Sequence, residues 1–224
     1  MALAFPVPME SFFVNLPVQF SELELGEAYE MNETGYGEIL TADIGTRLWQ
    51  MKVSLRDGSY AEIERFRARV NMLRQAGRTL IAHAIPGAFP RHDPDGSILG
   101  SATPTLNSVA ANMRDIRVAG LPTGYRIYDG DYISFQYGTN PVRYGFHQAV
   151  IPTTTGYVQA PSGGLSPVFE VTPNVRPGYA TGADVQLLRP RFKALIAPGS
   201  ANMGRSGQRQ TTGLSFTLIQ TLRN

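Results

Sequence analysis

Hydrophobic and polar residues alternate along much of this chain, and the alternating runs are short. The clearest early run is Thr46–Leu55, in which Trp49, Met51, Val53 and Leu55 alternate with mostly polar residues. A period of two places the apolar side chains on one face of a β-strand. The pattern therefore predicts a strand here with one buried face.

A β-meander is predicted over residues 124–152, where three short runs are separated by two tight turns. Asp129-Gly130 makes the first turn, because glycine tolerates the positive φ of a two-residue hairpin loop. Gly138-Thr-Asn-Pro141 makes the second turn, and Val142–Ile151 returns as the third strand. Further strands are expected within 11–25, 78–85, 115–119, 156–160, 167–172, 183–188, 191–197 and 214–222.

One segment has strong helical periodicity. Ser59-Tyr-Ala-Glu62 fits a capping box, in which a Ser hydroxyl and a Glu carboxylate bond free amides at a helix start. An apolar stripe follows at helical spacing, and Gly77 fits the position that ends a helix. We expect a helix over residues 59–76 that packs this stripe on the protein's own sheet, with partner binding as the rarer alternative. The stripe consists of Ile63, Phe66, Val70 and Leu73.

Three segments lack these periods. Residues 26–37 are acidic and contain glycine, which indicates a loop or an edge. Residues 86–108 and 198–213 are rich in Gly and Pro or Arg, and they predict long polar loops that add little to the core and contact partners. Asp93-Pro-Asp95-Gly96 resembles the start of a calcium loop. Ile98 stands where that motif needs Gly, and no Glu closes it, so no metal site is predicted.

The composition favours a single β-rich domain over residues 1–224, with a Pro/Gly-rich excursion at 86–112. Its 23 Gly and 16 Pro are spread along the chain, and 42% hydrophobic residues oppose disorder. The absence of Cys excludes disulfides and thiolate metal sites. The first residues lack a basic region and a long apolar run, so we expect neither a signal peptide nor a membrane segment.

Motifs of common catalytic and nucleotide sites are missing. The chain has no Walker A sequence, dinucleotide-binding glycine fingerprint, Gly-x-Ser-x-Gly elbow or His-Glu-x-x-His pair. His83, His92 and His147 are far apart and lack metal-ligand spacing. Carboxylate pairs are plentiful, so counting does not exclude a glycosidase, but none stands out from surface charge. The sequence predicts a protein that is not an enzyme and needs no cofactor.

Charge is distributed unevenly, although the net charge is only +2. Residues 1–45 hold eight acids and no Lys or Arg, a net of −8, whereas residues 171–224 hold seven bases and one acid, a net of +6. The two ends either pair within one subunit or meet between subunits. The candidate contact residues are Glu22, Glu24, Glu27, Arg189, Arg191, Lys193, Arg205 and Arg209.

Three features follow one another in a recognisable order. The Trp49 strand and helix 59–76 lead into strand 78–85; Gly130-Asp131-Tyr-Ile-Ser-Phe135 pairs with 142–151; and Val185–Pro198 is followed by Leu214-Ser-Phe-Thr-Leu218. This arrangement resembles tail-tip proteins of long-tailed, siphovirus-like bacteriophages and gene transfer agents, especially distal-tail and minor tail proteins. The resemblance covers most of residues 40–222.

The resemblance implies a β-sandwich related to the phage tail-tube fold, with one packed amphipathic helix and long polar loops. It implies a structural virion protein at the tail tip, present in the bacterial host cytoplasm during assembly. Such proteins form a ring, commonly a hexamer, that joins the tail tube to the baseplate hub and leaves a channel for DNA. The implied partners are further copies of the chain and the tail-tube, baseplate hub and tape-measure proteins, while DNA passes without specific binding.

A β-sandwich module that binds a carbohydrate or a host receptor is the alternative. It would use exposed aromatic side chains as sugar platforms, namely Tyr157, Tyr179, Tyr144 and Phe89. Some tail-tip proteins carry an added carbohydrate-binding domain. This chain has no room for a large one beyond residues 86–112.

Overall fold

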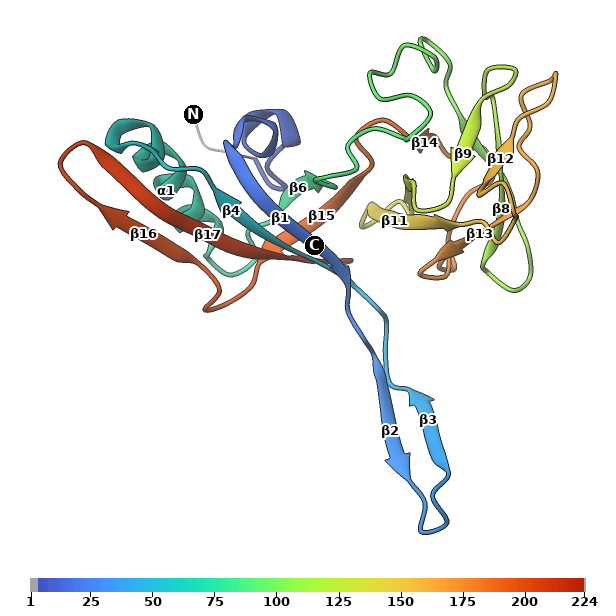
Figure 1. Ribbon diagram of the computed structural model, residues 1–224, viewed down its shortest axis with the longest axis horizontal. Coiled ribbons are helices and arrows are strands. Elements are labelled where there is room, and N and C mark those ends of the chain that lie inside the picture. The colour runs from blue at the N-terminus through green and yellow to red at the C-terminus, as the bar shows by residue number, and fades with distance from the viewer. Residues whose placement is uncertain (1–3, 224) are drawn as a thin grey trace. The chain divides into compact units, whose positions relative to one another are not determined.

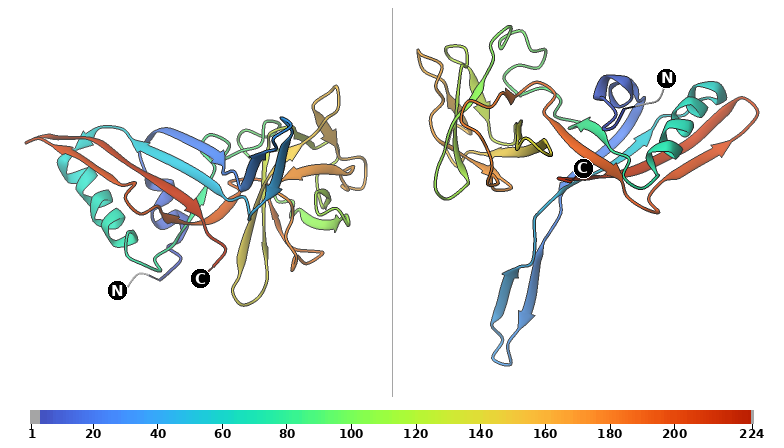
Figure 2. Two further views of the ribbon diagram at one scale, coloured as in Figure 1. Left: turned by 90° about the horizontal axis from the view of Figure 1, so that it is seen from below. Right: turned by 180° about the vertical axis from the view of Figure 1, so that it is seen from behind.

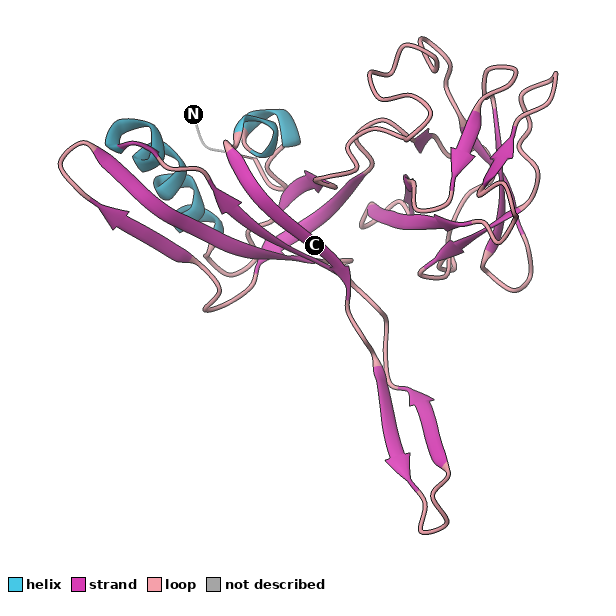
Figure 3. Ribbon diagram, in the orientation of Figure 1, coloured by secondary structure: helices cyan, strands magenta, loops and turns pink. Residues whose placement is uncertain are grey.

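The computed structural model describes residues 4–223 and is mainly β. Strands hold 41% of the residues and helical segments 9%, in several antiparallel sheets (Figure 3). This confirms the predicted fold class at the level of secondary structure, whereas a relation to the tail-tube fold stays a prediction. None of the helices between residues 4 and 223 is long and apolar enough to cross a membrane.

The chain divides into two compact units, each built from segments that are distant in sequence. Unit 1 comprises the residues up to Leu16, Gln75–Ala194 and the chain from Leu222, and unit 2 comprises Pro17–Arg74 and Leu195–Thr221. Two such units are compatible with one domain or with two. The prediction of a single domain therefore stays a prediction.

Unit 2 is built on an antiparallel sheet. Its β4 (Trp49–Leu55) lies between β1 (Val18–Leu25) and the long β17 (Gln210–Gln220) (Figure 1). The last of these also pairs with β5 (Gly58–Ser59) and β16 (Asn202–Ser206). The strands predicted within 11–25 are right only in part, because residues 9–15 form the 3-10 helices η1 (Met9–Ser11) and η2 (Phe13–Asn15) in unit 1.

The sheet of unit 2 buries one alternating set of side chains on each of two neighbouring strands. On β4 the buried set is Trp49, Met51, Val53 and Leu55, as the alternation predicts, and on β17 it includes Leu214, Phe216 and Leu218. Each fully buried side chain of this size contributes about 1.5–3 kcal/mol. These stripes make the sheet a stable platform for the elements attached to it.

Helix α1 (Tyr60–Leu73) lies along one face of this sheet (Figure 2). The Ser59 side chain accepts a hydrogen bond from the Glu62 amide at 3.3 Å, so the predicted N-cap is confirmed. In the predicted stripe, Ile63, Val70 and Leu73 are buried, but Phe66 is only half-buried. The helix ends before Gly77, which adopts a positive φ of 78° in the following turn.

An arginine fixes α1 to the edge strand β16. The Arg67 guanidinium donates hydrogen bonds to the carbonyl oxygens of Met203 and Gly204, and to Ser206 Oγ at 2.6 Å. It also pairs with Glu64, one helical turn earlier, at 3.2 Å. Because several charge-assisted bonds share one planar group, the helix and the strand are held in one relative position.

The prediction of a loop over residues 198–213 is wrong, because most of this segment is a hairpin of β16 and β17. Gly204 and Gly213 have φ values of 69° and 76° and lie between the paired residues Met203–Leu214 and Arg205–Thr212. A Cβ at Gly204 would collide with the Thr212 carbonyl oxygen. The glycines that suggested a loop instead permit close backbone approach inside a ladder.

Unit 1 contains a six-stranded antiparallel sheet. Its strand order is β14 (Val185–Gln186), β10 (Tyr132–Tyr137), β11 (Arg143–Val150), β13 (Phe169–Thr172), β8 (Asp115–Ala119) and β7 (Thr105–Val109). The two ends of this order are joined, because Leu106 N donates to Ala183 O (2.9 Å) and Val185 N donates to Pro104 O (2.8 Å). Joining the outer strands removes open edges that would otherwise pair with other chains.

The closed sheet surrounds the main core of unit 1. Leu106, Ile133, Phe135, Ala149 and Val171 are all at most 2% exposed and belong to this cluster. The predicted strands 115–119, 167–172 and 183–188 all lie in or overlap the sheet, so they are confirmed as strands.

The predicted meander is right in its second half and wrong in its first. Strands β10 and β11 pair as expected, but β9 (Arg126–Tyr128) pairs with β12 (Tyr157–Gln159) instead of β10. The Asp129-Gly130 turn exists, with Gly130 at φ 91°. It leads the chain from one sheet to the other, and the Asp131 carboxylate fixes the turn by accepting the Tyr128 amide at 2.8 Å.

Strand β15 (Arg191–Ile196) spans the boundary between the units. Its residues Arg191–Ala194 pair with β6 (Leu80–His83) in unit 1, and the strand residues from Leu195 belong to unit 2. In β6, burial lowers the pKa of His83, whose Nδ1 lies 2.8 Å from the Ala84 carbonyl oxygen. A buried ring of this kind fits the structural role predicted for this histidine.

The loop that follows β6 is irregular from residue 86 to 104, but it adds to the core, contrary to the prediction. Leu99 is 7% exposed and packs in the core cluster of unit 1. The fully buried Asp93 carboxylate accepts the amides of Ile98 (3.0 Å) and Leu99 (2.8 Å). Residues 105–109, expected to be loop or excursion, form β7.

Candidate functional site

A hairpin in unit 2, formed by β2 (Tyr29–Glu33) and β3 (Ile39–Asp43), is the most exposed regular element of the unit. We call residues 27–44 the arm. The arm continues the ladder of β1 and β4, because Gly26 N donates to Leu48 O and Ile44 N to Ala28 O, both at 2.9 Å. It extends beyond the end of the unit 2 sheet (Figure 1).

The turn of the arm is defined by hydrogen bonds around Thr34. Thr34 N donates to Glu38 O (2.8 Å), Gly37 N donates to Thr34 O (2.9 Å), and the Glu38 amide donates to Thr34 Oγ1 (3.1 Å). Gly37 has a φ of 79°, a conformation that favours glycine. The register that follows places Tyr29 opposite Asp43, and Glu33 opposite Ile39.

Both faces of the arm carry exposed apolar side chains. Residues opposite each other in a ladder lie on one face, so Tyr29, Met31 and Ile39 share one face and Leu40 lies on the other. Their exposed fractions range from 47% for Tyr29 to 62% for Ile39, and Tyr36 at the turn is 98% exposed. A cluster of exposed large apolar groups is typical of an interaction surface.

The arm is also strongly acidic. It contains five acids, Glu27, Glu30, Glu33, Glu38 and Asp43, and no Lys or Arg. Since the whole chain has a net charge of +2 and the arm carries −5, the rest of the chain carries +7. The arm is therefore suited to bind a partner surface that is both apolar and basic.

Sequence reasoning missed the arm as a regular element. Residues 26–37 were expected to form a loop or an edge because acids and glycines dominate there. The available signal was the repeat of larger side chains at Tyr29 and Met31 and at Ile39 and Leu40, on either side of Gly35 and Gly37. Neither strand has a buried face, so the apolar alternation that reveals other strands is weak.

Five of the eight predicted contact residues lie in unit 2. Glu22 and Glu24 are exposed on β1, and Glu22 lies opposite Lys52 of β4. Glu27 is exposed at the base of the arm, and Arg205 and Arg209 are exposed in the β16–β17 hairpin. The structure thus brings acids and bases of the two sequence ends into one unit, on different elements.

The other three predicted contact residues lie in unit 1. Arg189 is exposed and has a φ of 47°, and Arg191 is partly buried at the start of β15. Lys193 is only 6% exposed, and desolvation lowers the pKa of its ammonium group. Burial makes Lys193 the least accessible of the eight candidates.

The predicted sugar platforms occupy different settings within unit 1. The Arg126 guanidinium lies 4.7 Å from the Tyr157 ring centroid, and that of Arg189 lies 5.7 Å from Phe89. Tyr179 packs against the core cluster, whereas Tyr144 lines a cleft. Of this set, Tyr144 is the residue placed to contact a ligand inside a hollow.

The calcium-like segment is held together by its own backbone. Both Asp93 carboxylate oxygens accept amides of the same loop, and Asp95 accepts the Ser97 amide at 3.0 Å. Residues 4–223 contain no group of three or more His, Asp or Glu side chains arranged to hold a metal ion. The carboxylates at this turn have a structural role in shaping the loop.

Comparison of the chain with known proteins found no matching family model and no curated protein with significant similarity.

Proposed function

We propose that this protein is a non-enzymatic structural subunit that assembles with copies of itself into a ring at a phage tail tip. The observation that carries the assembly part of this proposal is the arm. It is a regular, acidic and apolar element whose side chains are all exposed on β2 and β3.

The arm has too little of its own packing to be stable without a partner surface. An isolated two-stranded hairpin is marginally stable in water, because neither face is covered. Its carboxylates also repel one another along the same short element. Docking on an apolar, basic surface would remove both disadvantages.

A second copy of the chain supplies a surface of the required charge. The part of the chain outside the arm carries a net charge of +7, and Arg205 and Arg209 are exposed on a different hairpin of the same unit. A contact between an arm and a different surface on the next copy is heterologous. Repeating such a contact closes a ring when the rotation between copies permits it.

The identity of the ring comes from the resemblance of residues 40–222 to distal-tail and minor tail proteins. On this proposal the fold is a sandwich related to the tail-tube fold, and the ring, commonly of six copies, joins the tail tube to the baseplate hub. Acidic side chains at the channel would repel phosphates, so DNA would pass without specific binding. The tape-measure protein would occupy the same channel before DNA release.

The tail-tip assignment is tested by locating the protein. Mass spectrometry of purified phage particles made by the host that encodes the chain should detect it at a low copy number, close to a small multiple of six. Immunogold labelling should mark the distal end of the tail. Absence from purified particles, or labelling along the capsid, would contradict the tail-tip assignment and leave self-assembly to be judged separately.

A receptor-binding role is the second candidate, and it is favoured by one observation. Tyr144, one of the predicted sugar platforms, lines the cleft in unit 1. Such a role is compatible with a ring, because the cleft and the arm belong to different units.

A further inference from the structure

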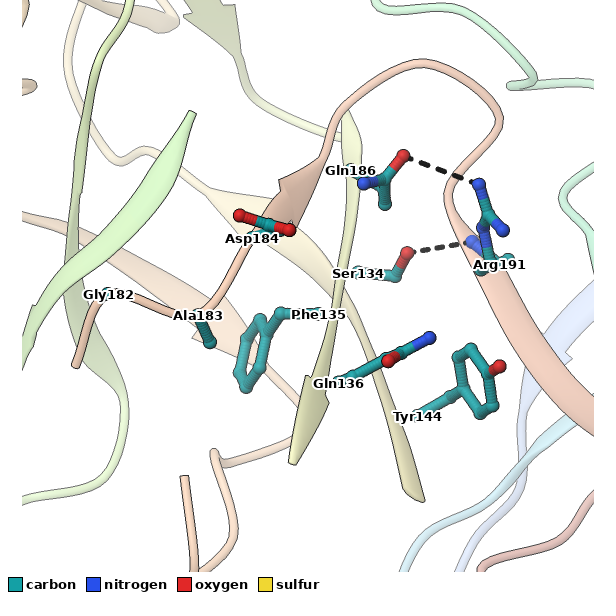
Figure 4. Close-up of a pocket in the computed structure, with 9 residues that line it drawn as sticks. All are labelled: Ser134, Phe135, Gln136, Tyr144, Gly182, Ala183, Asp184, Gln186 and Arg191. Atoms are coloured by element: carbon teal, nitrogen blue, oxygen red, sulfur yellow. Dashed lines mark hydrogen bonds between the residues drawn. The ribbon is translucent and has the colours of Figure 1, made fainter. Parts of the chain in front are cut away.

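A cleft of about 360 Å³ lies in unit 1 beside the start of β15. It is lined by β10, by Tyr144 of β11, by Gln186 of β14 and the segment before it, and by Arg191 (Figure 4). The volume falls in the range of about 300–1,000 Å³ that is typical of small-molecule sites. The cleft is therefore large enough to hold a small organic ligand.

The polar side chains of the cleft come from one face of three neighbouring strands. Gln136 lies opposite Tyr144 in the β10–β11 ladder, and Ser134 lies opposite Gln186 in the β10–β14 ladder. Residues 134 and 136 share a face because strand side chains alternate. The opposite face of β10 carries Ile133 and Phe135, which are buried in the core.

The floor of the cleft is fixed by the backbone of β15. The Arg191 amide donates to Ser134 Oγ at 2.7 Å, and Ser134 is fully buried. The Arg191 guanidinium reaches Gln186 Oε1 at 3.5 Å (Figure 4). Because these groups are held by two ladders and a short hydrogen bond, the cleft is preformed.

Arg191, which lines the cleft, has one buried donor with no hydrogen-bond partner among the described residues. The Nε of Arg191 is buried and makes no such bond within residues 4–223. Buried donors are normally paired, so a bound water is expected to accept from it. The exposed carboxylate of Asp184 and the exposed amide of Gln136 add an acceptor and a mixed donor–acceptor group at other points of the rim.

We propose that this cleft binds a neutral oligosaccharide, with Tyr144 as the apolar contact and Gln136, Asp184, Gln186 and Arg191 as partners for sugar hydroxyls. A hydroxyl both donates and accepts, so it matches a site that offers carboxylate, amide and guanidinium groups together. Tyr144 supplies a flat apolar surface with a polar end, which suits the C–H face of a sugar ring.

The charges of the cleft argue for a neutral ligand. Asp184 and Arg191 are the two ionised side chains in its lining, and their charges oppose each other. A phosphate or a polyanionic sugar would gain from Arg191 and lose at Asp184. A peptide lying in the cleft is a different occupant, and the experiment below separates it from a sugar.

The test uses the full-length protein and an array of neutral and acidic oligosaccharides built from hexoses and N-acetylhexosamines. The strongest neutral binder is then titrated by NMR and by calorimetry. We expect the amide signals of residues 134–136, 144 and 184–186 to shift. Tyr144→Ala and Asp184→Asn should each weaken binding by about tenfold or more, which corresponds to at least about 1.4 kcal/mol.

Two further features of the design make the binding result conclusive: a control variant outside the cleft, and a cleft variant that keeps the size of its side chain. Tyr60→Ala removes an exposed tyrosine of α1, 48% exposed and outside both the cleft and the arm, and should leave affinity unchanged. Asp184→Asn changes an exposed side chain and keeps its size, so its result stands even if Tyr144→Ala fails to fold. The proposal is overturned if no neutral oligosaccharide binds, if only acidic ones bind, or if both variants bind as tightly as the wild type. Binding of a peptide in the cleft without any sugar binding would also overturn it.

Discussion

At the scale of single residues, the apolar stripe of α1 contains side chains that are buried to different extents. Leu73 is 2% exposed, whereas Phe66 is only half-buried. Leu73→Ala should therefore reduce the free energy of unfolding by about 2–5 kcal/mol, the range for emptying a core site. Phe66→Ala should cost less than Leu73→Ala, since part of its ring already contacts water. Urea unfolding of both variants checks this order, and a reversed order would contradict the burial of the stripe.

A second residue-scale prediction concerns pH. Burial lowers the pKa of His147 to about 4, and its ring stacks on Phe135 while its Nδ1 lies 2.7 Å from the Pro173 carbonyl oxygen. The unfolded chain, with an ordinary His pKa, binds this proton more readily, so stability falls as the pH drops from about 6.5 to about 4. The full loss is about 3 kcal/mol.

Urea unfolding at pH 7 and pH 5 measures this effect in the wild type and in His147→Gln, which keeps a donor for the Pro173 carbonyl. The variant should lose less stability between the two pH values than the wild type does. Equal losses in the two proteins would show that His147 does not carry the pH dependence.

At the scale of elements, the loop over residues 86–104 should behave as part of the core. Asp93→Ala would leave the Ile98 and Leu99 amides without their acceptor, at a cost of about 1–3 kcal/mol for each one that stays unpaired. Asp95→Ala is the matched control, because the Asp95 carboxylate is exposed. A fall in the urea midpoint for Asp93→Ala with little change for Asp95→Ala is expected. Equal midpoints for the two variants would show that the loop adds nothing to the core.

The arm should be the least protected strand pair of a lone subunit. Its strands bury no side chain, so its backbone hydrogen bonds open easily in the absence of a partner. Hydrogen–deuterium exchange should be fast over residues 29–43 in the dilute protein and slow after assembly, while β4 and β17 stay protected in both. Slow exchange of the arm in a monomer would mean that the arm is stable without a partner.

Elements with one buried face could be predicted from the sequence, and elements without one could not. The Trp49–Leu55 strand and the Ser59 cap follow from alternation and capping chemistry, and both are confirmed. The arm has no buried face. The β16–β17 hairpin contains Gly204 and Gly213, which make its sequence look like that of a loop. Glycine marks loops in most sequences, so a ladder that needs glycine for close approach is read as a loop.

At the scale of the whole molecule, strand pairing between distant segments could not be predicted from the sequence. The closure of the unit 1 sheet depends on Pro104–Leu106 meeting Ala183–Val185, and no local period encodes that contact. The pairing of β9 with β12 instead of β10 is of the same kind. The cleft follows from these pairings, which is why Tyr144 could be named as a platform while its companions Gln136, Gln186 and Asp184 could not.

The charge pattern gives the assembly its expected salt dependence. The arm carries −5 and the rest of the chain +7, so contacts between an arm and a neighbouring copy should be attractive at low salt. At 1 M salt the Debye length falls to about 3 Å, which screens exposed charges. The apolar side chains of the arm are not screened, so assembly should weaken without vanishing.

The most direct measurement of the central claim is the mass of the particle in solution, with and without the arm. Ala28 and Ile44 are already hydrogen-bonded neighbours, so replacing residues 29–43 by Asn-Gly closes the ladder with a two-residue turn. Native mass spectrometry at low and high salt, alone and with the tail-tube protein, should show a closed oligomer of the wild-type chain that weakens with salt. The arm-replaced chain should stay folded and monomeric. A wild-type chain that is strictly monomeric and ignores the tube protein under every condition, or an arm-replaced chain that still forms the same oligomer, would contradict the account.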